Sequence, residues 1–272
     1  MISVIMGVYN IENEKILRTS INSILNQTYK DIEFIICDDG STDDTYYILE
    51  QICKSDSRIK LIKNSVNMRA SGARNRCLKE ANGEFIAIMD ADDYSLPERL
   101  KNQIEFLTQN DEFDFVGCKG KYFEDKINNN TGEYWYCEYP EKKDFLVTLP
   151  FVHASIIFKK DALLKAGGYS MNKKVNRSED YDLIMRMYAM GYKGANIDKA
   201  LYYIRQDEKT FKRRKYRYRI NEAIVKYEGF KRLKLMPIGI IFAIKPLIVG
   251  IIPIGLLNLI KDKYYKMKRM KN

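Results

Sequence analysis

The chain reads Glu84-Phe85-Ile86-Ala87-Ile88-Met89-Asp90-Ala91-Asp92-Asp93, an apolar run that passes directly into three carboxylates. An uninterrupted apolar run rich in Ile predicts a strand of a parallel sheet, buried on both faces. Because ligands bind outside the carboxyl ends of such strands, we expect Asp90 and Asp92 at a ligand site. Their i, i+2 spacing can present hard oxygens to Mg²⁺ or Mn²⁺, with water and substrate phosphates as further ligands.

A second interpretation of this stretch stays open. The residues that follow it, Ser95-Leu96-Pro97-Glu98, have the composition of a helix start with Pro in the first turn. The acidic residues can therefore also be a turn that caps this helix, because a bare Asp-x-Asp pair is a weak signal.

Strand and helix signals alternate through the first half of the chain. Short apolar runs predict strands at 3–6, 33–37 and 59–62, and apolar residues at helical spacing predict helices at 14–25, 46–53 and 70–81. This order predicts an α/β fold whose mainly parallel sheet is flanked by helices through right-handed crossovers. The second half differs, with an aromatic-rich hairpin predicted at 114–139, a strand at 153–158 and a helix at 178–190.

Charge is unevenly distributed along the chain. The net charge is +10, but residues 209–272 hold 18 Lys and Arg against 3 Asp and Glu (+15), which leaves −5 for residues 1–208. The length predicts one α/β domain of about 200 residues with an appendage. A basic appendage indicates a polyanionic partner, either nucleic acid or anionic lipid.

The cysteines and the N-terminus indicate the compartment. Five cysteines are scattered without a C-x-x-C pair, which is typical of reduced thiols in a cytosolic core. The chain starts without a basic segment followed by an apolar one, since the first apolar run ends at Gly7. We therefore expect the catalytic part in the cytoplasm.

A second acidic turn, Asp38-Asp39-Gly40-Ser41, follows the strand at 33–37 and should meet Asp90 at the same sheet edge. One of its acids can accept the imide N3–H of uracil, because a buried base edge needs a hydrogen-bond partner. The alternative is an Asx turn that caps the next helix. Arg74, in the first turn of its helix, can donate to a diphosphate or a base, or else lie on a solvated face.

Five segments in order resemble the motifs of family 2 glycosyltransferases of the GT-A fold, over roughly residues 1–205. They are Ser3-Val4-Ile5-Met6-Gly7-Val8-Tyr9-Asn10, Ser23-Ile24-Leu25-Asn26-Gln27-Thr28-Tyr29, Asp38-Asp39-Gly40-Ser41-Thr42-Asp43, Asp90-Ala91-Asp92-Asp93 and Ser178-Glu179-Asp180-Tyr181-Asp182-Leu183. Each motif is weak alone, but the ordered set is specific.

The resemblance implies roles for the matching residues. Gly7, Val8, Tyr9 and Asn10 are expected to pack on the nucleoside, and Asp39 to read the base. Asp90, with Ala91, is expected near the ribose and the metal, and Asp92 as the ligand of the Mn²⁺ or Mg²⁺ that bridges the phosphates. Family members invert the anomeric centre, and Asp180 is the expected general base, with Glu179 held in reserve.

Physical chemistry agrees with a base at Asp180. Inversion is one in-line displacement, so a carboxylate must deprotonate the acceptor hydroxyl while a metal neutralises the departing nucleoside diphosphate. We expect Ser178 to cap this helix and the helix dipole to favour the ionised form of Asp180. The alternative is a first-turn acid that serves only the dipole.

Some positions depart from the family pattern. Gly7 stands where many relatives have Pro or Thr, so contacts there are expected from the backbone. Relatives often carry a His after an Arg beyond the base helix, whereas Arg205-Gln206-Asp207 has none. Candidates for the acceptor side are His153, Tyr169 and Arg205, although a structural histidine at a strand end is equally compatible with His153.

The tail combines an apolar and a basic character. Residues 235–260 contain one charge, Lys245, but Pro237, Pro246 and Pro253 divide the segment. Lys and Arg clusters flank both ends, which disfavours a span, so we expect an interfacial or re-entrant attachment to an anionic membrane surface. A buried helix pair and a true span are the alternatives, and no nucleic-acid partner is expected.

Together these features predict a membrane-associated, metal-dependent inverting glycosyltransferase, peripheral or monotopic on the inner face of the cell membrane. It is expected to move a sugar from a nucleotide sugar, UDP-linked, to a lipid-linked glycan in surface polysaccharide synthesis. The predicted domain is 1–208, with a nucleotide-binding half (1–113) and an acceptor half (114–208), followed by the tail 209–272. The alternatives are a sugar-phosphate nucleotidyltransferase and a non-catalytic, nucleotide-binding membrane-docking module.

Overall fold

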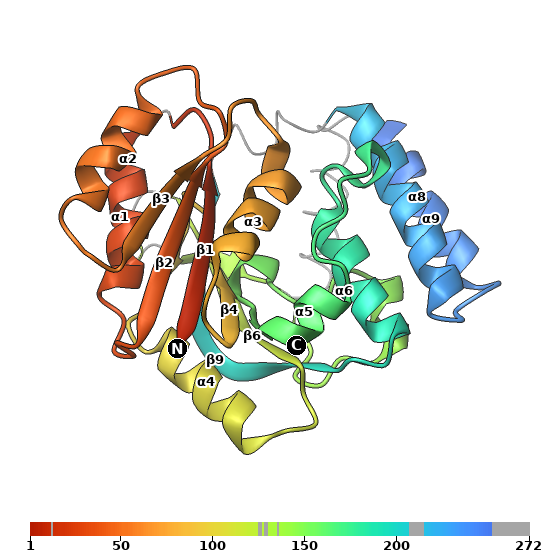
Figure 1. Cartoon of the computed structure of the whole chain (residues 1–272). Helices are drawn as coiled ribbons and strands as arrows, with labels where there is room; N and C mark the ends of the chain where they lie inside the picture. Colours follow the sequence, from red (N-terminus) through yellow and green to blue (C-terminus); the bar gives the residue numbers. More distant parts are fainter. Residues whose placement is uncertain (12, 125–126, 128–129, 135, 207–214, 252–272) are drawn as a thin grey trace.

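The computed structural model describes residues 1–251 except 12, 125–126, 128–129, 135 and 207–214. One curled sheet runs through the molecule, with helices on both faces (Figure 1). Strands β1 (Ile2–Val8), β2 (Ile32–Asp38), β3 (Ile59–Lys63) and β4 (Phe85–Ile88) are mutually parallel in the order β3-β2-β1-β4. They alternate with α1 (Glu14–Leu25), α2 (Thr45–Cys53) and α3 (Arg69–Glu80), which confirms the predicted α/β pattern.

The sheet continues beyond β4 with mixed directions. The order is β4-β8-β6-β9-β5, with β8 (Ile157–Lys159) antiparallel to both neighbours and β9 (Gly194–Arg205) parallel to β6 (Phe115–Phe123). Strand β7 (Asn130–Glu133) pairs with β6 as the predicted hairpin, and β5 (Tyr94–Ser95) pairs with the end of β9. The intervening elements are α4 (Arg99–Gln109), η1 (Lys142–Leu146), η2 (His153–Ser155), α5 (Lys160–Lys165), η3 (Lys173–Val175) and α6 (Glu179–Ala189).

Two of the sequence expectations are wrong in detail. The strand expected at 153–158 begins as a 3₁₀ turn, because Ser155 Oγ donates to Val152 O and its carbonyl accepts from Gln103 and Arg99 instead of a neighbouring strand. Ser95 lies in β5, and the helix expected to begin near it begins at Arg99. Strand β9 was not predicted, because its apolar pattern is irregular and its register with β6 shifts twice.

A buried arginine holds the acidic turn that follows β4. The Arg99 side chain is fully buried, and its Nε donates to Ser95 Oγ at 2.7 Å. Its Nη1 donates to Ile88 O at 3.4 Å and to Ser155 O at 3.0 Å. Because Ile88 and Ser95 flank residues 89–94, one side chain fixes both ends of the turn that carries the carboxylates.

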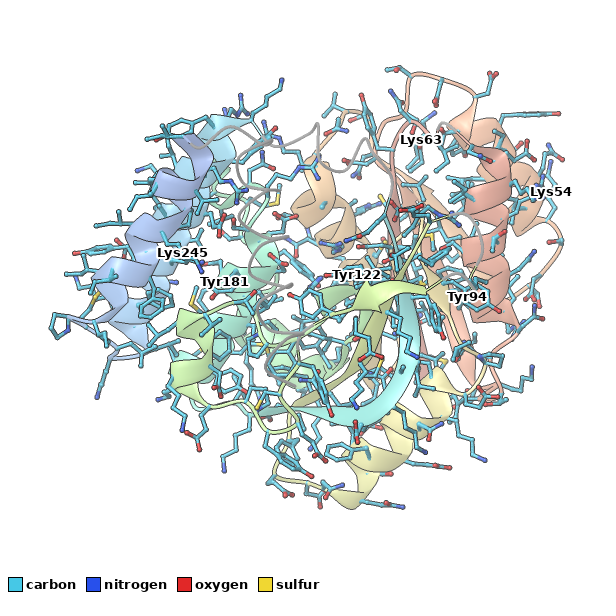
Figure 2. All side chains as sticks on the ribbon, turned by 180° about the vertical axis from the view of Figure 1, so that it is seen from behind. Lys54, Lys63, Tyr94, Tyr122, Tyr181 and Lys245 are labelled. Atoms are coloured by element: carbon cyan, nitrogen blue, oxygen red, sulfur yellow. The ribbon has the colours of Figure 1, made fainter. Side chains whose placement is uncertain are left out.

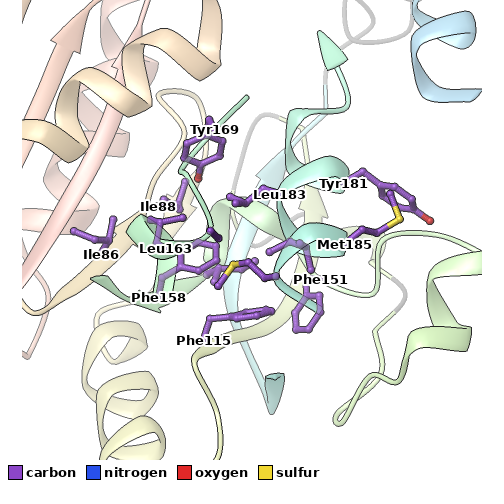
Figure 3. Packing of buried hydrophobic residues seen from close by; sticks show 14 of the residues in the cluster. Ile86, Ile88, Phe115, Phe151, Phe158, Leu163, Tyr169, Tyr181, Leu183 and Met185 are labelled. Atoms are coloured by element: carbon purple, nitrogen blue, oxygen red, sulfur yellow. The ribbon is translucent and has the colours of Figure 1, made fainter. Parts of the chain in front are cut away.

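Apolar side chains form a core on each face of the sheet. One cluster lies under α1, α2 and α4, and the other lies under α3, α5 and α6. The second contains the aromatic contacts of Phe115 with Phe151 and Phe158, ring centroids 5.1 and 5.3 Å apart (Figure 3). All five cysteines are free, and Cys37, Cys77 and Cys118 are buried as expected of core thiols.

The C-terminal helices pack against the globular part. Helix α8 (Tyr216–Arg232) lies along α6, and α9 (Gly239–Ile251) lies along α8 (Figure 1). Val225, Phe230, Leu233 and Ala243 belong to the same apolar cluster as α6. Figure 2 shows this pair at one side of the molecule, with Tyr181 of α6 facing it and Lys245 on α9.

The described part of the tail therefore includes a packed helix pair, which was the second expectation for this segment. None of the described helices is long and apolar enough to cross a membrane. Pro253 and the basic cluster after residue 260 lie outside the described residues.

A close approach between β1 and α3 positions the ligand edge. A Cβ atom on Gly7 would lie 2.9 Å from the Cβ of Ala73, closer than side chains pack. Glycine at this position lets α3 lie against the sheet, and Arg74 follows Ala73 directly. Close packing against Ala73 thus explains why Gly7 departs from the family pattern in the first motif.

We predict that Gly7→Ala lowers the free energy of unfolding by about 1–2 kcal/mol through overpacking. Gly132→Ala is the matched control, because its new Cβ would meet its nearest neighbour, Tyr122, at 3.7 Å, an ordinary contact. In the Ala73→Gly variant the facing Cβ atom is absent. Adding Gly7→Ala to that variant should therefore lower the free energy of unfolding by less than Gly7→Ala does in the wild type. Urea denaturation of the variants measures this, and equal stability of Gly7→Ala and wild type would contradict the packing explanation.

Candidate active site

Two adjoining hollows open at the carboxyl edge of the parallel strands. The first has a volume of about 400 Å³ and the second about 350 Å³. Ala70, Arg74, Arg177 and Glu179 line both, so the hollows meet along these residues. The first extends to Asp39 and to the loop after β1, and the second extends to Asp90, His153 and Asp180.

Asp39 forms the polar end of the first hollow. Its side chain is buried, and its Oδ1 accepts hydrogen bonds from Asn64 Nδ2 at 2.8 Å and from the Met68 amide at 2.9 Å. Burial raises the pKa of Asp39, while these hydrogen bonds oppose the rise. Asn64 was not singled out from the sequence, although its place two residues after the strand predicted at 59–62 is a usable signal.

The loop after β1 contributes Gly7, Val8 and Tyr9 to the first hollow. Asn10 has a different position: its side chain exchanges two hydrogen bonds with Thr42, at 2.9 and 3.2 Å, and so ties this loop to the loop after β2. Ala91 packs beside the apolar core, and neither Asn10 nor Ala91 lines either hollow.

Arg74 lies between two acidic elements. Its Nη2 is 2.7 Å from Asp90 Oδ1 and its Nη1 is 3.9 Å from Glu179 Oε1, while the guanidinium carbon lies 5.5 Å from the centre of the Tyr169 ring. Burial disfavours its charge, but its anionic neighbours, Asp90 first, raise the pKa of Arg74 above its ordinary value. Arg74 is therefore a permanent cation where the hollows join.

The three acids of the turn after β4 lie in different surroundings. Asp93 is buried and accepts a hydrogen bond from the Arg205 amide at 2.9 Å, and burial, with Asp92 and Asp90, raises its pKa well above the usual value. Asp92 is exposed, and Asp90 is partly exposed and lines the second hollow. Asp93 therefore anchors β9, and the other two acids face solvent.

Asp90 and Asp92 are the residues that fit a divalent cation. Within the described part of the chain, no group of three or more His, Cys, Asp and Glu side chains could hold a metal ion. Magnesium is typically held by one or two carboxylates together with substrate phosphates, so Asp90, which lines the second hollow, and the exposed Asp92 two residues further on suit a shared site, although Asp92 lines neither hollow. The donor set is compatible with such an ion and too small to hold it alone.

The first turn of α6 brings two acids to the second hollow. Burial, and then the charge of Glu179, raise the pKa of Asp180 to about 6. The expected dipole effect on Asp180 is thus outweighed, and Ser178 stands at the N-cap without a side-chain capping bond. Glu179 Oε2 is buried and has no hydrogen-bond partner among the described residues.

The acceptor candidates differ in their placement. His153 lines the second hollow, and its Nε2 lies 2.9 Å from Tyr169 Oη. Burial, and then Arg74, hold the pKa of His153 well below its usual range, so its ring is neutral. Tyr169, labelled in Figure 3, is buried, and its ring lies edge-on to that of His153 with the ring centroids 5.6 Å apart. Arg205 donates to Asp92 O at 3.0 Å and to Glu124 O at 2.5 Å and lines neither hollow.

Comparison with known proteins identifies the family. The profile described as "Glycosyl transferase family 2" matches residues 3–167. The chain belongs to glycosyl transferase family 2. This glycosyltransferase is 39% identical over 270 residues to EpsE of Bacillus subtilis, itself provisionally named a glycosyltransferase, over 99% of this chain and 94% of EpsE.

A second relative carries a more detailed name. The glycosyltransferase is 31% identical over 244 residues to WfaP of Escherichia coli, over 85% of this chain and 88% of WfaP. WfaP is named a UDP-Glc:alpha-D-GlcNAc-diphosphoundecaprenol beta-1,3-glucosyltransferase. With the family match, these relatives confirm the predicted membership in a family 2 group of bacterial polysaccharide biosynthesis and set aside the nucleotidyltransferase alternative.

A solved structure confirms the fold. The crystal structure of S. aureus TarS 1-349 in complex with UDP-GlcNAc matches the family 2 chain with a TM-score of 0.68 at 24% identity. The match covers 84% of this chain and 66% of the TarS chain. The predicted GT-A fold, with a mixed sheet and flanking helices, is therefore confirmed.

The hollows also contain residues that sequence reasoning missed. Asn67, Arg69, Asn176 and Tyr218 line the first hollow, Tyr134 lines the second and Arg177 lines both. Arg177 directly precedes the Ser178–Leu183 motif, which is a local signal. Tyr218 has no such signal, because it lies on α8 within the segment interpreted as a tail.

Proposed function

We propose that this glycosyltransferase moves a sugar from a UDP-linked donor to a lipid-linked glycan acceptor in surface polysaccharide synthesis, with inversion of configuration. The observation that carries the proposal is one continuous depression with Asp39 at one end, Arg74 in the middle, and Asp90 and Asp180 at the other. The same order is found in the substrates: the nucleobase of the donor, its diphosphate and then the acceptor. The activity for which WfaP is named, and the UDP-GlcNAc bound to TarS, support the donor and acceptor classes.

Each part of the donor has a complementary group in this arrangement. Asp39 accepts the imide N3–H of uracil, because Asn64 and Met68 already orient its carboxylate. The backbone of Gly7, Val8 and Tyr9 packs on the nucleoside. Arg74 attracts the diphosphate as a charged donor where the two hollows meet.

Asp90 and Asp92 hold Mn²⁺ or Mg²⁺ jointly with the diphosphate. When bound, the ion neutralises the charge that develops on the departing nucleoside diphosphate. Arg74 Nη2 lies 2.7 Å from Asp90 Oδ1, and Arg99 and Asp93 keep the turn in place, so Asp90 and Asp92 would be presented to the ion as hard oxygen ligands.

Asp180 is the general base that removes the proton from the acceptor hydroxyl. With a pKa of about 6 it is largely ionised at pH 7 and yet a stronger base than an ordinary aspartate. Inversion follows, because the hydroxyl attacks the anomeric carbon directly and no enzyme nucleophile intervenes. The neutral His153 is a hydrogen-bonding partner for a sugar hydroxyl on the wall of the same hollow.

We assign the tail to the inner face of the cell membrane, which suits a lipid-linked acceptor. The outer face of α9 carries exposed isoleucines, 42–73% accessible: Ile240, Ile241, Ile244, Ile248 and Ile251. The net charge of +15 for residues 209–272 adds attraction to anionic lipid. We retain 1–113, 114–208 and 209–272 as the nucleotide-binding, acceptor and membrane segments.

Thermal unfolding in the presence of UDP, GDP, dTDP and CDP, each with and without Mn²⁺, tests the donor site. We expect UDP with Mn²⁺ to stabilise the wild type by about 2.7 kcal/mol at about 100 times its Kd. Asp92→Ala should remove the part that depends on Mn²⁺, and Asp39→Asn should weaken every nucleotide with an imide edge. Glu84→Gln, at an exposed acid on the opposite edge of the sheet, is the control. Absence of any nucleotide effect on the wild type contradicts the proposal.

The pH dependence of transfer tests the base. We expect kcat/KM to fall as the pH drops through about 6, because Asp180 becomes protonated. Glu179→Gln removes a negative charge that favours the protonated form, so the inflection should move to lower pH. Asp180→Asn should reduce kcat by about 10²–10⁴-fold and leave UDP binding intact. An unchanged inflection in Glu179→Gln, or substantial transfer by Asp180→Asn, would exclude this role.

Sedimentation with vesicles that contain phosphatidylglycerol tests the membrane face. We expect Ile241→Asp/Ile248→Asp to reduce vesicle binding by about tenfold or more, since two apolar side chains are replaced by charges of the same sign as the lipid. Both side chains are exposed, so folding should be unaffected. Tyr47→Asp, at an exposed position on α2, is the control. Equal binding of all three proteins would show that α9 does not dock.

A further inference from the structure

Helix α8 reaches the first hollow, which is the donor hollow of the proposed function, although α8 belongs to the segment 209–272 that we interpreted as a tail. Tyr218, in the first turn of α8, lines the first hollow together with Gly7, Tyr9 and Arg69 of the nucleotide-binding half. One contact fixes α8 to the segment before α6, where Asn221 Nδ2 donates to Asn176 O at 3.1 Å, and another fixes it to α6 itself, where Arg232 Nη1 lies 3.3 Å from Asp182 Oδ1. The tail therefore supplies part of the hollow's wall.

The ring of Tyr218 lies beside two guanidinium groups. The carbon of the Arg177 guanidinium is 6.0 Å from the ring centre, and that of Arg217 is 5.2 Å from it. Cations are attracted to the faces of aromatic rings at such distances. Tyr218 thus holds Arg177 from the side of the tail.

Arg177 has an unusual backbone conformation for a residue with a long side chain. Its φ is 70°, in the left-handed region that glycine adopts freely. Its neighbours hold this conformation, since Asn176 O accepts from Asn221 and the Ser178 amide donates to Val175 O at 2.8 Å. Retained strain at a ligand hollow points to a use for the side chain.

The place of Arg177 indicates its ligand. It lines both hollows, as Arg74 does, so it lies at the junction through which a donor must extend toward the acceptor. Arg74 is already engaged by Asp90 and Glu179, whereas Arg177 is exposed at the mouth. A guanidinium can bind two phosphate oxygens at once.

We infer that Arg177, positioned by Tyr218 of α8, binds the β-phosphate of the nucleotide donor. Its positive charge then stabilises the nucleoside diphosphate as the leaving group. The inference rests on the proposed donor site and adds a residue of the tail to it. Arg177 is the binding residue and Tyr218 is a positioning residue. Donor binding and the seating of α8 on α6 are consequently coupled.

The test compares ligands that differ in their phosphates. Titration calorimetry with Mg²⁺ measures the binding of UDP, UMP and inorganic pyrophosphate to wild type, Arg177→Gly and Tyr218→Ala. We expect Arg177→Gly to weaken UDP and pyrophosphate by about tenfold or more and to leave UMP, which lacks the β-phosphate, within about twofold. Tyr218→Ala should weaken the same two ligands by a smaller factor, and Tyr218→Phe should retain most of the affinity, because its ring remains.

Stability and charge controls separate binding from folding. Arg177→Gly should raise the melting temperature, because glycine adopts a φ of 70° without strain, so weaker binding cannot be attributed to unfolding. Lys174→Ala removes a nearby exposed positive charge, and Tyr227→Ala removes an exposed aromatic ring on α8; both should bind UDP normally.

The outcomes distinguish the inference from the function it rests on. If UDP binds equally to wild type and Arg177→Gly, the role of Arg177 is refuted and the donor site stands. If pyrophosphate binding falls in Arg177→Gly but UDP and UMP do not bind the wild type, the role of Arg177 stands, and the assignment of uracil as the nucleobase of the donor is wrong. If the wild type binds none of the three ligands, both are refuted.

Discussion

The ion pair of Arg74 with Asp90 is the interaction on which the site depends. It joins α3 to the turn after β4, and the longer contact with Glu179 extends it to α6. The acids Asp90, Glu179 and Asp180 line one partly buried depression, and Arg74 is a cation among them that reduces their mutual repulsion. Arg74 can be that cation because Gly7 allows α3 to lie against the sheet.

The acidic residues around Arg74 differ in their environment. Asp90 is beside the cation and partly exposed to solvent. Asp93 lies deeper, and burial favours its protonated form, which suits a structural acceptor for the end of β9. Asp180 is intermediate, because burial and Glu179 raise its pKa while Arg74 and the Tyr181 amide lower it. Aspartates of one site thus differ in environment because they differ in burial and in distance from Arg74.

The sequence predicted the parts of the fold that local patterns determine. Apolar runs located β1 to β4, and the rule that ligands bind at the carboxyl ends of parallel strands brought Asp39, Arg74 and Asp90 to one edge. Strand β9 was missed because its pairing depends on β6 and β5, far away in the sequence. The turn at His153 was taken for a strand because the hydrogen bonds of Ser155 to Arg99 and Gln103 are tertiary. The pKa of Asp180 was misjudged for a similar reason, since burial is not visible in a helix start.

Charge and hydropathy alone did not predict where the tail lies relative to the core. Its basic and apolar residues indicated a separate attachment, yet α8 uses Val225, Phe230 and Leu233 to join the core and carries Tyr218 to the first hollow. The same helix pair turns its isoleucines outward on α9. One helical hairpin thus has two different surfaces: α8 adds apolar side chains to the core and Tyr218 to the first hollow, whereas α9 leaves its isoleucines exposed. A hydropathy pattern averages over these surfaces, so it indicates an apolar segment without showing which side of it packs against the domain.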